Sequence, residues 1–236
     1  MEDINRKLYL DLLKKSLLDV IYEPITIEKI EGTVHPKRAH TMIGLERLNN
    51  IQSCFENVLN EGIEGSLIET GVWRGGATIF MAGLVKSYNQ NRKVFVADSF
   101  SGLPMPNPDI YPVDKGDKHY TYHDLNVSFE EVYENFRSYD LIDENIIFLK
   151  GWFKDTLPTI KDEKFSIVRL DGDMYESTYQ ALENLYENLS IGGYLIVDDW
   201  LLNGARQAVE DYRREKNIND EICYIHKYSV FWKKSK

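Results

Sequence analysis

The sequence predicts an α/β fold built around a mainly parallel β-sheet. The runs 165–170 and 193–197 are short, β-branched and apolar, are bounded by turn signals, and are separated by a segment of helical length. Similar strand-sized runs alternate with helix-sized segments from residue 66 onward. Strands that alternate with helices indicate parallel pairing through crossover connections. At 236 residues the chain is long enough for one such domain and an N-terminal extension.

The individual elements can be assigned in order along the chain. Apolar residues recur among acids and lysines over residues 3–22, which predicts an amphipathic helix, and the segment that follows to about residue 38 is expected to be irregular. Further helices are predicted at 42–61, 76–88, 128–139, between 170 and 193, and at 204–216, strands at 66–70, 93–97, 146–149, 165–170 and 193–197, and a long polar stretch at 99–127. The last two strands, 221–226 and 229–233, are separated by a short turn, which predicts an antiparallel hairpin at the sheet edge.

Residues 1–62 are therefore predicted to form a helical N-terminal extension, and residues 63–236 the α/β domain. The apolar side of the first helix must be buried against something, either the domain itself or a second copy of the chain. We accordingly expect a homo-oligomer, a dimer or larger.

Composition and charge exclude several classes of partner. A formal net charge of −10 argues against nucleic acid, because affinity for a phosphate backbone comes from clustered Lys and Arg. The sequence has no apolar run long enough to span a bilayer, and its first residues lack the apolar core of a signal peptide. Only Cys54 and Cys223 are present, without metal-type spacing. We expect a reduced, cytoplasmic protein that acts on neither nucleic acid nor membranes.

Two acidic pairs follow neighbouring predicted strands. Asp171-Gly-Asp173 comes directly after one strand, and Asp198-Asp199 after the next. In an open α/β sheet ligands bind outside the carboxyl ends of the strands. Neighbouring carboxylates repel one another unless they hold a cation or share a proton, so the pattern predicts a divalent metal site. The alternative is that Asp173 and Asp199 only cap the helices that follow them.

A glycine-rich turn, Gly71-Val-Trp-Arg-Gly75-Gly76, follows the first predicted strand. Glycine lets the backbone turn sharply and approach a ligand closely, which suits a nucleotide-type cofactor lying across the first crossover. The pattern is not Gly-x-Gly-x-x-Gly, and Glu69 in front of it would repel a pyrophosphate. The same carboxylate would favour a ligand that carries a positive amino group.

The second predicted strand ends at Asp98-Ser99. An acid at this position can accept hydrogen bonds from both ribose hydroxyls of a nucleoside, although an ordinary turn or cap is the alternative. The glycine turn and this acid together favour a cationic adenosine cofactor over a dinucleotide. S-adenosylmethionine fits that description.

At this point the chain resembles the macrocin O-methyltransferase family. The resemblance is carried by His40-Thr-Met-Ile-Gly44, Glu69-Thr-Gly-Val-Trp-Arg-Gly-Gly76, Ala97-Asp-Ser-Phe100, Gly151-Trp-Phe-Lys-Asp-Thr156, Asp171-Gly-Asp173 and Val197-Asp-Asp199, six blocks in the same order. It covers nearly the whole chain, from the N-terminal helix to Val230-Phe-Trp232. It implies a Rossmann-like class I methyltransferase fold, with a seven-stranded, mainly parallel sheet, an antiparallel C-terminal strand and an N-terminal helical lid. It also implies metal-dependent methyl transfer from S-adenosylmethionine to a sugar hydroxyl of a glycosylated natural product or related glycan.

The resemblance also implies roles for particular residues. Glu69, Thr70, Gly71, Val72 and Trp73 would line the methionine end of the cofactor, Asp98 and Ser99 the ribose, and Gly151, Trp152 and Phe153 the adenine, with Thr41 and Met42 folding over the site and Asp171 beside it. Asp171, Asp198 and Asp199 would hold Mg²⁺. The stretch from Leu103 to Leu125 departs most from the family's pattern, and it is where the acceptor should bind, so the resemblance leaves the acceptor open.

The chemistry suggests how these carboxylates would act. A sugar hydroxyl is a poor nucleophile at neutral pH, so the enzyme must position it and remove its proton. Mg²⁺ chelated by two neighbouring hydroxyls would lower the pKa of the attacking one, and an adjacent carboxylate could accept the proton. We expect Asp171 to be both metal ligand and base, with Asp173 as the second candidate base. Mg²⁺ is favoured because the predicted ligands are all carboxylate oxygens.

Several other polar and aromatic residues are weaker candidates. His119 and His123 could contact the acceptor or serve as base, and His40 could face the site. Tyr111, Tyr120 and Tyr122 could form a wall against a sugar ring, and Trp73 and Trp152 could be cofactor walls or core residues. Arg74 could pair with Glu69 or hold the turn against the sheet, and His226 is expected to be a strand residue.

Three competing functions remain open from sequence. A metal-dependent methyltransferase acting on a catechol-type phenol would use the same carboxylates, with a flat apolar slot beside the metal. A binding protein that keeps the fold without catalysis would not need three carboxylates facing a metal. A nucleotide-sugar dehydrogenase is disfavoured because the pyrophosphate-type glycine pattern is missing.

Overall fold

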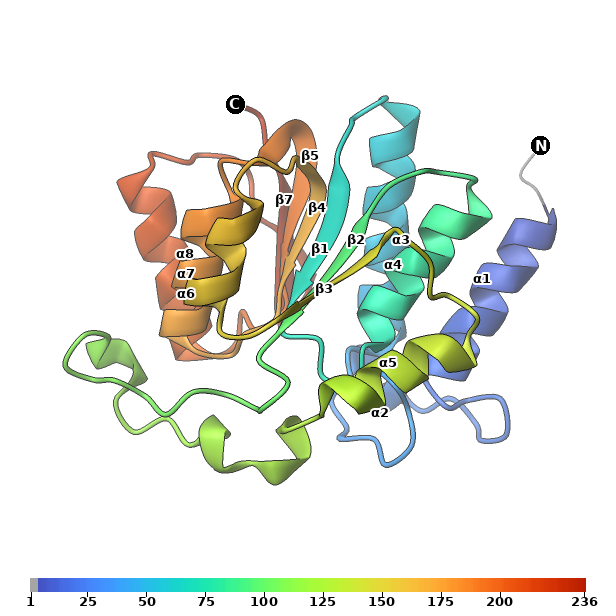
Figure 1. Cartoon of the computed structure of the whole chain (residues 1–236), viewed down its shortest axis with the longest axis horizontal. Coiled ribbons are helices and arrows are strands. Elements are labelled where there is room, and N and C mark those ends of the chain that lie inside the picture. The colour runs from blue at the N-terminus through green and yellow to red at the C-terminus, as the bar shows by residue number, and fades with distance from the viewer. Residues whose placement is uncertain (1–3) are drawn as a thin grey trace.

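The computed structural model describes residues 4–236 and has three layers, a seven-stranded sheet between two layers of helices (Figure 1). The strand order is β3-β2-β1-β4-β5-β7-β6. The strands are β1 (Ser66–Thr70), β2 (Val94–Asp98), β3 (Ile146–Lys150), β4 (Phe165–Leu170), β5 (Leu189–Val197), β6 (Cys223–His226) and β7 (Ser229–Lys233). Strands β1 to β5 pair in parallel, and β7 is antiparallel to both β5 and β6. The predicted α/β fold with a mainly parallel sheet is confirmed.

Helices cover both faces of this sheet. The α-helices are α1 (Ile4–Leu17), α2 (Ile27–Glu31), α3 (Gly44–Asn60), α4 (Gly76–Ser87), α5 (Phe129–Ser138), α6 (Phe153–Thr156), α7 (Tyr175–Leu185) and α8 (Asn203–Glu215). Helices α1, α3, α4 and α5 lie over one face, and α6, α7 and α8 over the other (Figure 1). Because both faces are covered, every residue of β1 and β4 is buried, including the polar residues Ser66, Glu69 and Thr70 of β1 and Ser166 and Arg169 of β4.

The N-terminal helices share a core with the sheet. Leu13 and Leu17 of α1 and Leu48 of α3 are buried in the same apolar cluster as Phe80 of α4 and Ile167 of β4. No helix in residues 4–236 is long and apolar enough to cross a membrane. The described part of the N-terminal extension therefore packs onto the α/β domain and does not form a core of its own.

Some element boundaries differ from the sequence prediction. The first helix was predicted over 3–22, but it ends at Leu17 and a turn follows in which Asp19 has a φ of 52°; residue 3 lies outside the described residues. The short helix α2 forms in a segment predicted to be irregular, because Thr26 caps its N-terminus and Gly32 ends it at a φ of 69°. Strand β5 begins four residues earlier than predicted, at Leu189.

Other differences concern short helical turns and the last strands. Helix α6 and a 3-10 turn at Leu157–Ile160 follow Trp152, where only a turn was predicted. The polar stretch 99–127 contains 3-10 turns at Pro112–Asp114, His119–Thr121 and His123–Leu125. The C-terminal hairpin forms as predicted, but only β6 is at the edge because β7 lies between β5 and β6.

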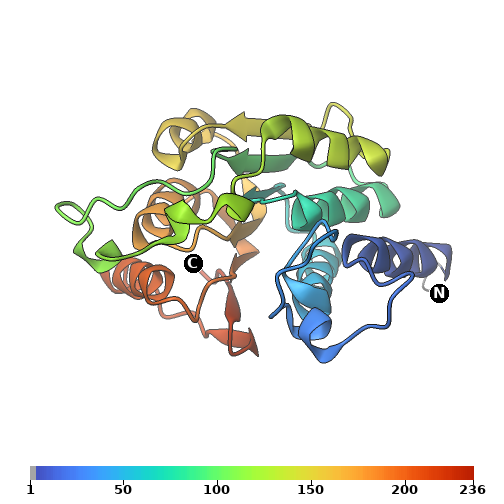
Figure 2. The same ribbon diagram turned by 90° about the horizontal axis from the view of Figure 1, so that it is seen from below.

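The carboxyl ends of the parallel strands meet at one edge of the sheet. Figure 2 looks onto this edge and shows the stretch 99–127, in green, running from β2 toward α7 and α8. The strand order reverses between β1 and β4, since β2 lies on one side of this pair and β5 on the other. In open α/β sheets a crevice opens at such a reversal, and ligands bind there.

Candidate active site

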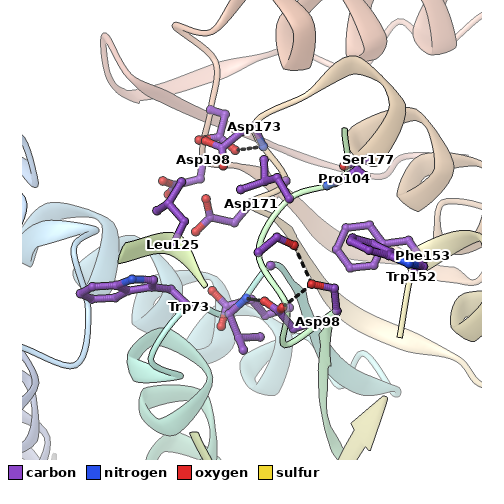
Figure 3. A pocket seen from close by; sticks show the side chains of 18 of the residues that line it. Trp73, Asp98, Pro104, Leu125, Trp152, Phe153, Asp171, Asp173, Ser177 and Asp198 are labelled. Atoms are coloured by element: carbon purple, nitrogen blue, oxygen red, sulfur yellow. Dashed lines mark hydrogen bonds between the residues drawn. The ribbon is translucent and has the colours of Figure 1, made fainter. Parts of the chain in front are cut away.

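A cavity of about 520 Å³ opens at this reversal point, a size common for small-molecule sites (Figure 3). Its lining combines the residues Gly32, Thr41, Met42, Ile43, Arg47, Glu69, Gly71, Val72, Trp73, Ala77, Asp98, Ser99, Gly102, Leu103, Pro104, Met105, Asn107, Leu125, Gly151, Trp152, Phe153, Lys154, Asp171, Gly172, Asp173, Glu176, Ser177, Gln180, Asp198 and Asp199. The predicted site residues therefore come together in one cavity, with the exception of Thr70. The Thr70 side chain is buried, and its hydroxyl donates to the carbonyl oxygen of Arg169 at 3.5 Å.

Three carboxylates from β4 and β5 converge in the cavity. One oxygen each of Asp171, Asp198 and Asp199 lies within 4.8 Å of the others, close enough to bind one cation. Asp173 lies beside them (Figure 3), and its backbone N–H donates to the Asp199 carboxylate at 2.9 Å. Oxygen-only ligands of this kind suit a hard divalent cation such as Mg²⁺.

Two buried arginines that the sequence analysis did not single out balance these acids. The Arg169 guanidinium is fully buried at the base of the site and donates to Glu69, to Asp198 and, at 2.6 Å, to Asp171. Arg47 of α3 donates to the other oxygen of Asp198. A buried arginine must be paired, so an arginine inside the apolar run of β4 was the signal that could have indicated acids on neighbouring strands.

The surroundings change the pKa values of the cluster. Burial, reinforced by the neighbouring Asp198 charge, raises the pKa of Asp171 to about 8, although Arg169 opposes the shift. Burial and then the Asp173 charge raise the pKa of Asp199 well above its ordinary value. Burial works to lower the pKa of Arg169, but Asp198, Asp171 and Glu69 raise it well above its usual value, so the guanidinium stays charged. The carboxylates outnumber the arginines, so without a cation the cluster holds protons, which a bound cation could replace.

The capping alternative for Asp173 and Asp199 is wrong. Helix α7 receives its cap from Asp114 of the polar stretch, whose two carboxylate oxygens accept from Tyr175 N–H at 2.7 Å and Glu176 N–H at 2.9 Å. The side chain of Asp199 accepts from the backbone of Asp173 instead of capping α8. Both acids therefore remain available to the cavity.

Asp173 has a backbone conformation that side chains rarely adopt. Its φ is 59°, and Trp73 and Phe100 at the same edge of the sheet have φ values of 50° and 53°. Left-handed conformations of non-glycine residues cost free energy and tend to occur at functional sites. Burial raises the pKa of the Asp173 carboxyl, while His119 acts in the opposite direction.

The glycine turn after β1 approaches β4 too closely for any other residue. Gly71 has a φ of 83°, and a Cβ atom there would lie 1.8 Å from the Asp171 carbonyl oxygen. Asp98 holds the turn, because its carboxylate accepts from Val72 N–H at 2.7 Å and from Phe100 N–H at 2.7 Å. Burial raises the pKa of Asp98, although these N–H donors oppose the shift. Asp98 thus faces the cavity while shaping its floor.

Glu69 lies beneath the turn and is almost fully buried. Its carboxylate accepts from the Thr78 hydroxyl and from Arg169, and burial raises its pKa. Of the two roles that the sequence left open for Arg74, pairing with Glu69 is wrong. Arg74 instead donates to the carbonyl oxygens of Lys37 and Ala39, at 3.0 Å and 3.1 Å, and so ties the N-terminal segment to the turn.

The aromatic residues at the two sides of the cavity have different surroundings. Trp73 donates from its indole N–H to the Asp124 carbonyl oxygen at 2.8 Å, and the Arg74 guanidinium lies 4.3 Å from its ring centre. Trp152 and Phe153 lie on the opposite side of the cavity from Trp73 (Figure 3). Both sides therefore offer flat surfaces to a bound ligand.

The weaker candidates of the polar stretch do not line the cavity. His119 pairs with Asp117 at 2.8 Å, and Tyr111 packs against Tyr175. The residues that do line it from this stretch are Gly102, Leu103, Pro104, Met105, Asn107 and Leu125. His123, Tyr120 and Tyr122 also lie outside the lining. A polar loop gives no periodic signal, so sequence could not tell which of its side chains face inward.

His40 and His226 do not line the cavity. The ring nitrogen Nδ1 of His40 lies 2.9 Å from the Tyr139 hydroxyl. Its backbone also joins the N-terminal segment to the domain, since its carbonyl oxygen accepts from Gly76 N–H at 2.9 Å. His226 is a half-buried residue of β6, as predicted.

Comparison with known proteins agrees with this geometry. A model of the family described as Macrocin-O-methyltransferase (TylF) matches residues 26–234. The 8-demethyl-8-(2,3-dimethoxy-alpha-L-rhamnosyl)-tetracenomycin-C 4'-O-methyltransferase of Streptomyces olivaceus is 44% identical over 99% of this chain and 95% of its own length. The mycinamicin III 3''-O-methyltransferase of Micromonospora griseorubida is 42% identical over 97% of each chain. The solved structure of the O-methyltransferase NovP has a TM-score of 0.92 and 46% identity, covering 98% of this chain and 100% of that one.

Proposed function

Since the chain belongs to the macrocin O-methyltransferase family, whose members are S-adenosylmethionine-dependent O-methyltransferases, we propose that it methylates a sugar hydroxyl of a glycosylated small molecule. The observation that carries this proposal is the convergence of Asp171, Asp198 and Asp199 beside the glycine turn in one cavity. Methyl transfer needs the donor and a deprotonated acceptor held side by side. The name of the tetracenomycin relative, which is 44% identical over nearly its full length, gives a rhamnosyl compound as the molecule it methylates.

The cofactor would lie along the ends of β1 and β2. The methionine part would contact Glu69 and the Gly71–Trp73 turn, and the ribose would contact Asp98 and Ser99. The adenine would lie against the Gly151–Phe153 turn. This placement is supported by the shared cavity and by the acidic floor, which favours a sulfonium and an amino group over a phosphate. Thr41 and Met42 would cover the cofactor, so the N-terminal extension would act as a lid.

Asp171, Asp198 and Asp199 would hold Mg²⁺. The donor set fits this ion, because each residue offers a carboxylate oxygen and, within residues 4–236, no cysteine or histidine lines the cavity. When bound, the ion would lower the pKa of an acceptor hydroxyl that coordinates it. The protein would fix the direction of these carboxylates through Arg169 and through the backbone N–H of Asp173.

Asp171 and Asp173 are the two candidate bases. Asp171 forms an ion pair with Arg169 at 2.6 Å, so one of its oxygens is already engaged, although burial still raises its pKa overall. Asp173 has no arginine or lysine partner within residues 4–236. This difference favours Asp173 as the acceptor of the hydroxyl proton, with Asp171 acting as ligand.

The lining of the cavity suits a neutral or cationic acceptor. Glu176 adds a further acid beside the carboxylate cluster, and among residues 4–236 the basic residues of the lining are Lys154 and Arg47, of which Arg47 is already paired with Asp198. A nucleoside diphosphate would be repelled by this field. Leu103, Pro104 and Met105 add an apolar wall, against which we place the aglycone of a glycoside.

We also propose that the protein self-associates and works in the cytoplasm. Helix α1 has two apolar sides, since Leu10, Leu13 and Leu17 are buried while Ile4, Leu8 and Leu12 are exposed at positions four residues apart. An exposed apolar stripe of this kind favours a second copy of the chain as its cover. The two cysteines are free, which agrees with a reducing compartment.

Calorimetric titration of S-adenosylhomocysteine into the protein, with and without Mg²⁺, tests the cofactor and the metal. We expect binding in the micromolar range or tighter, and Asp199→Asn should bind the cofactor but lose the response to Mg²⁺. Asp109→Asn, an exposed acid of the polar stretch, is the matched control. Absence of cofactor binding would overturn the proposal in favour of a binding protein without catalysis.

A methylation assay with mass spectrometry tests the acceptor. We expect methyl transfer to a rhamnoside with an aromatic aglycone, and no transfer to thymidine diphosphate rhamnose. Transfer to a catechol at a higher rate than to the glycoside would show that the phenol alternative is correct.

A further inference from the structure

Arg47 connects the proposed metal site to the N-terminal extension. One nitrogen of its guanidinium donates to Asp198, and the other donates to the carbonyl oxygens of Gly32 at 2.8 Å and Glu31 at 3.3 Å. Its side chain is only 8% exposed. A single arginine thus joins a candidate metal ligand to the end of α2.

The end of α2 packs tightly at this point. Gly32 is in the left-handed region, and a Cβ atom there would lie 2.3 Å from the Arg47 guanidinium. A Cβ atom on Gly44 would lie 2.3 Å from the Gly32 nitrogen, so α2 and the start of α3 are in backbone contact. Gly32 also lines the cavity. We define residues 26–34, which contain α2 and this turn, as the cover segment.

Asp198 differs from the other two proposed ligands. Each of its oxygens accepts from a guanidinium, one from Arg169 and the other from Arg47. Within residues 4–236, Asp171 and Asp199 each use only one carboxylate oxygen in a hydrogen bond. Asp198 is therefore the ligand at which Mg²⁺ would meet two positive charges already in place.

Arg47 is also incompletely paired where it lies. Its Nε–H is buried without a hydrogen-bond partner among the described residues. The attraction that keeps it there is the negative field of the acids, above all Asp198. A divalent cation on the same carboxylate would weaken that attraction, because like charges a few ångströms apart repel strongly in a partly buried site.

We infer that Arg47 is the counterion that occupies Asp198 when Mg²⁺ is absent, and that the two compete, so that metal binding loosens the hold of Arg47 on the cover segment. This inference rests on the proposed metal site. By thermodynamic linkage the effect is reciprocal. The factor by which bound Mg²⁺ weakens the contact between Arg47 and the cover segment is also the factor by which that contact weakens Mg²⁺ binding. Arg47 is accordingly a positioning residue that makes the cover segment responsive to the metal.

The experiment combines calorimetric Mg²⁺ titration with hydrogen exchange of the full chain, both without cofactor. In Arg47→Met the Mg²⁺ affinity should rise by at least about fivefold, the lower end of common coupling energies. Arg47→Lys keeps the charge and should have an affinity close to that of the wild type. Arg38→Met is the matched control, since Arg38 belongs to the same extension but pairs with Asp19 at the surface.

Hydrogen exchange measures directly how often the backbone of the cover segment opens. Mg²⁺ should speed exchange at residues 26–34 in the wild type, whereas in Arg47→Met exchange there should be fast from the start and unchanged by Mg²⁺. Residues 35–40 provide an internal control, because Arg74 and not Arg47 holds them. They should not respond to the ion in either protein.

Two results would overturn the inference. An unchanged or weaker Mg²⁺ affinity in Arg47→Met would show that Arg47 orients Asp198 instead of competing for it. A Mg²⁺ response of residues 26–34 that persists in Arg47→Met would show that another contact carries the coupling. Failure of the proposed function looks different, because the wild type would then bind no Mg²⁺ or no S-adenosylhomocysteine, and the competition would fall with the metal site.

Discussion

The carboxylate of Asp98 serves the turn after β1 before it can serve a ligand. Its oxygens accept from Val72 N–H and Phe100 N–H, both at 2.7 Å. Asp98→Asn replaces one acceptor with a donor that faces a buried N–H, so we expect the affinity for S-adenosylhomocysteine to fall roughly 10- to 100-fold. Calorimetric titration measures this, with Asp109→Asn as the control. Unchanged affinity would mean that Asp98 does not shape the cofactor site.

Individual site residues could be predicted from sequence where they follow a strand. Asp171, Asp198 and Asp199 were found because acids directly after buried strands must meet at one edge of a parallel sheet. Arg47 was missed because its partner Asp198 is 151 residues away. Arg169 pairs with Asp171 two residues along the chain, but its other partners, Glu69 and Asp198, are 100 and 29 residues away on other strand ends. Local patterns of apolar and polar residues carry no information about which distant side chains form an ion pair.

At the scale of elements, the cap of α7 comes from a distant part of the chain. Asp114 is 3% exposed and binds the first two N–H groups of the helix. We expect Asp114→Ala to lower the free energy of unfolding by about 1–2 kcal/mol, as loss of a helix cap does. Chemical denaturation measures this. Asp109→Ala in the same stretch should have no effect, and an equal loss in both variants would contradict the capping role.

The elements that sequence predicted best are those with a strong periodic or apolar signal. Strands β1, β4 and β7 were predicted with the bounds that they have, and the antiparallel pairing of the last two strands is confirmed. Helix α2 was missed because five residues are too few to show a helical period. The position of β7 inside the sheet could not be predicted, because strand order depends on long-range packing and not on the local pattern.

At the scale of the whole molecule, the exposed side of α1 predicts an assembly. Leu8 and Leu12 are 63% and 57% exposed, one helical turn apart. We expect the wild type to elute as a dimer or larger in size-exclusion chromatography with light scattering. The double variant Leu8→Glu with Leu12→Glu should be monomeric, because charges on the stripe cannot be buried at an apolar contact. Ile191→Glu, an exposed apolar residue at β5, is the control, and a monomeric wild type would contradict the proposal.

The acid cluster should also set how the stability of the whole protein depends on pH. The pKa of Asp171 rises from 3.8 to about 8 on folding, so between these values the folded protein binds a proton that the unfolded chain does not. Stability contributed by that proton is present at low pH and is lost as the pH rises toward 8. The metal-free protein should therefore have a lower Tm at about pH 8 than at about pH 6.

Mg²⁺ should reverse this trend, because a carboxylate must lose its proton before it binds a cation. The increase in Tm on adding saturating Mg²⁺ should be larger at about pH 8 than at about pH 6, as measured by differential scanning calorimetry. Asp171→Asn cannot titrate at this position, so it should show a weaker dependence of Tm on pH and a smaller response to the ion. A metal-free wild type whose Tm rises from pH 6 to pH 8 would contradict the raised pKa, and with it the view that the cluster is protonated until a cation replaces the proton.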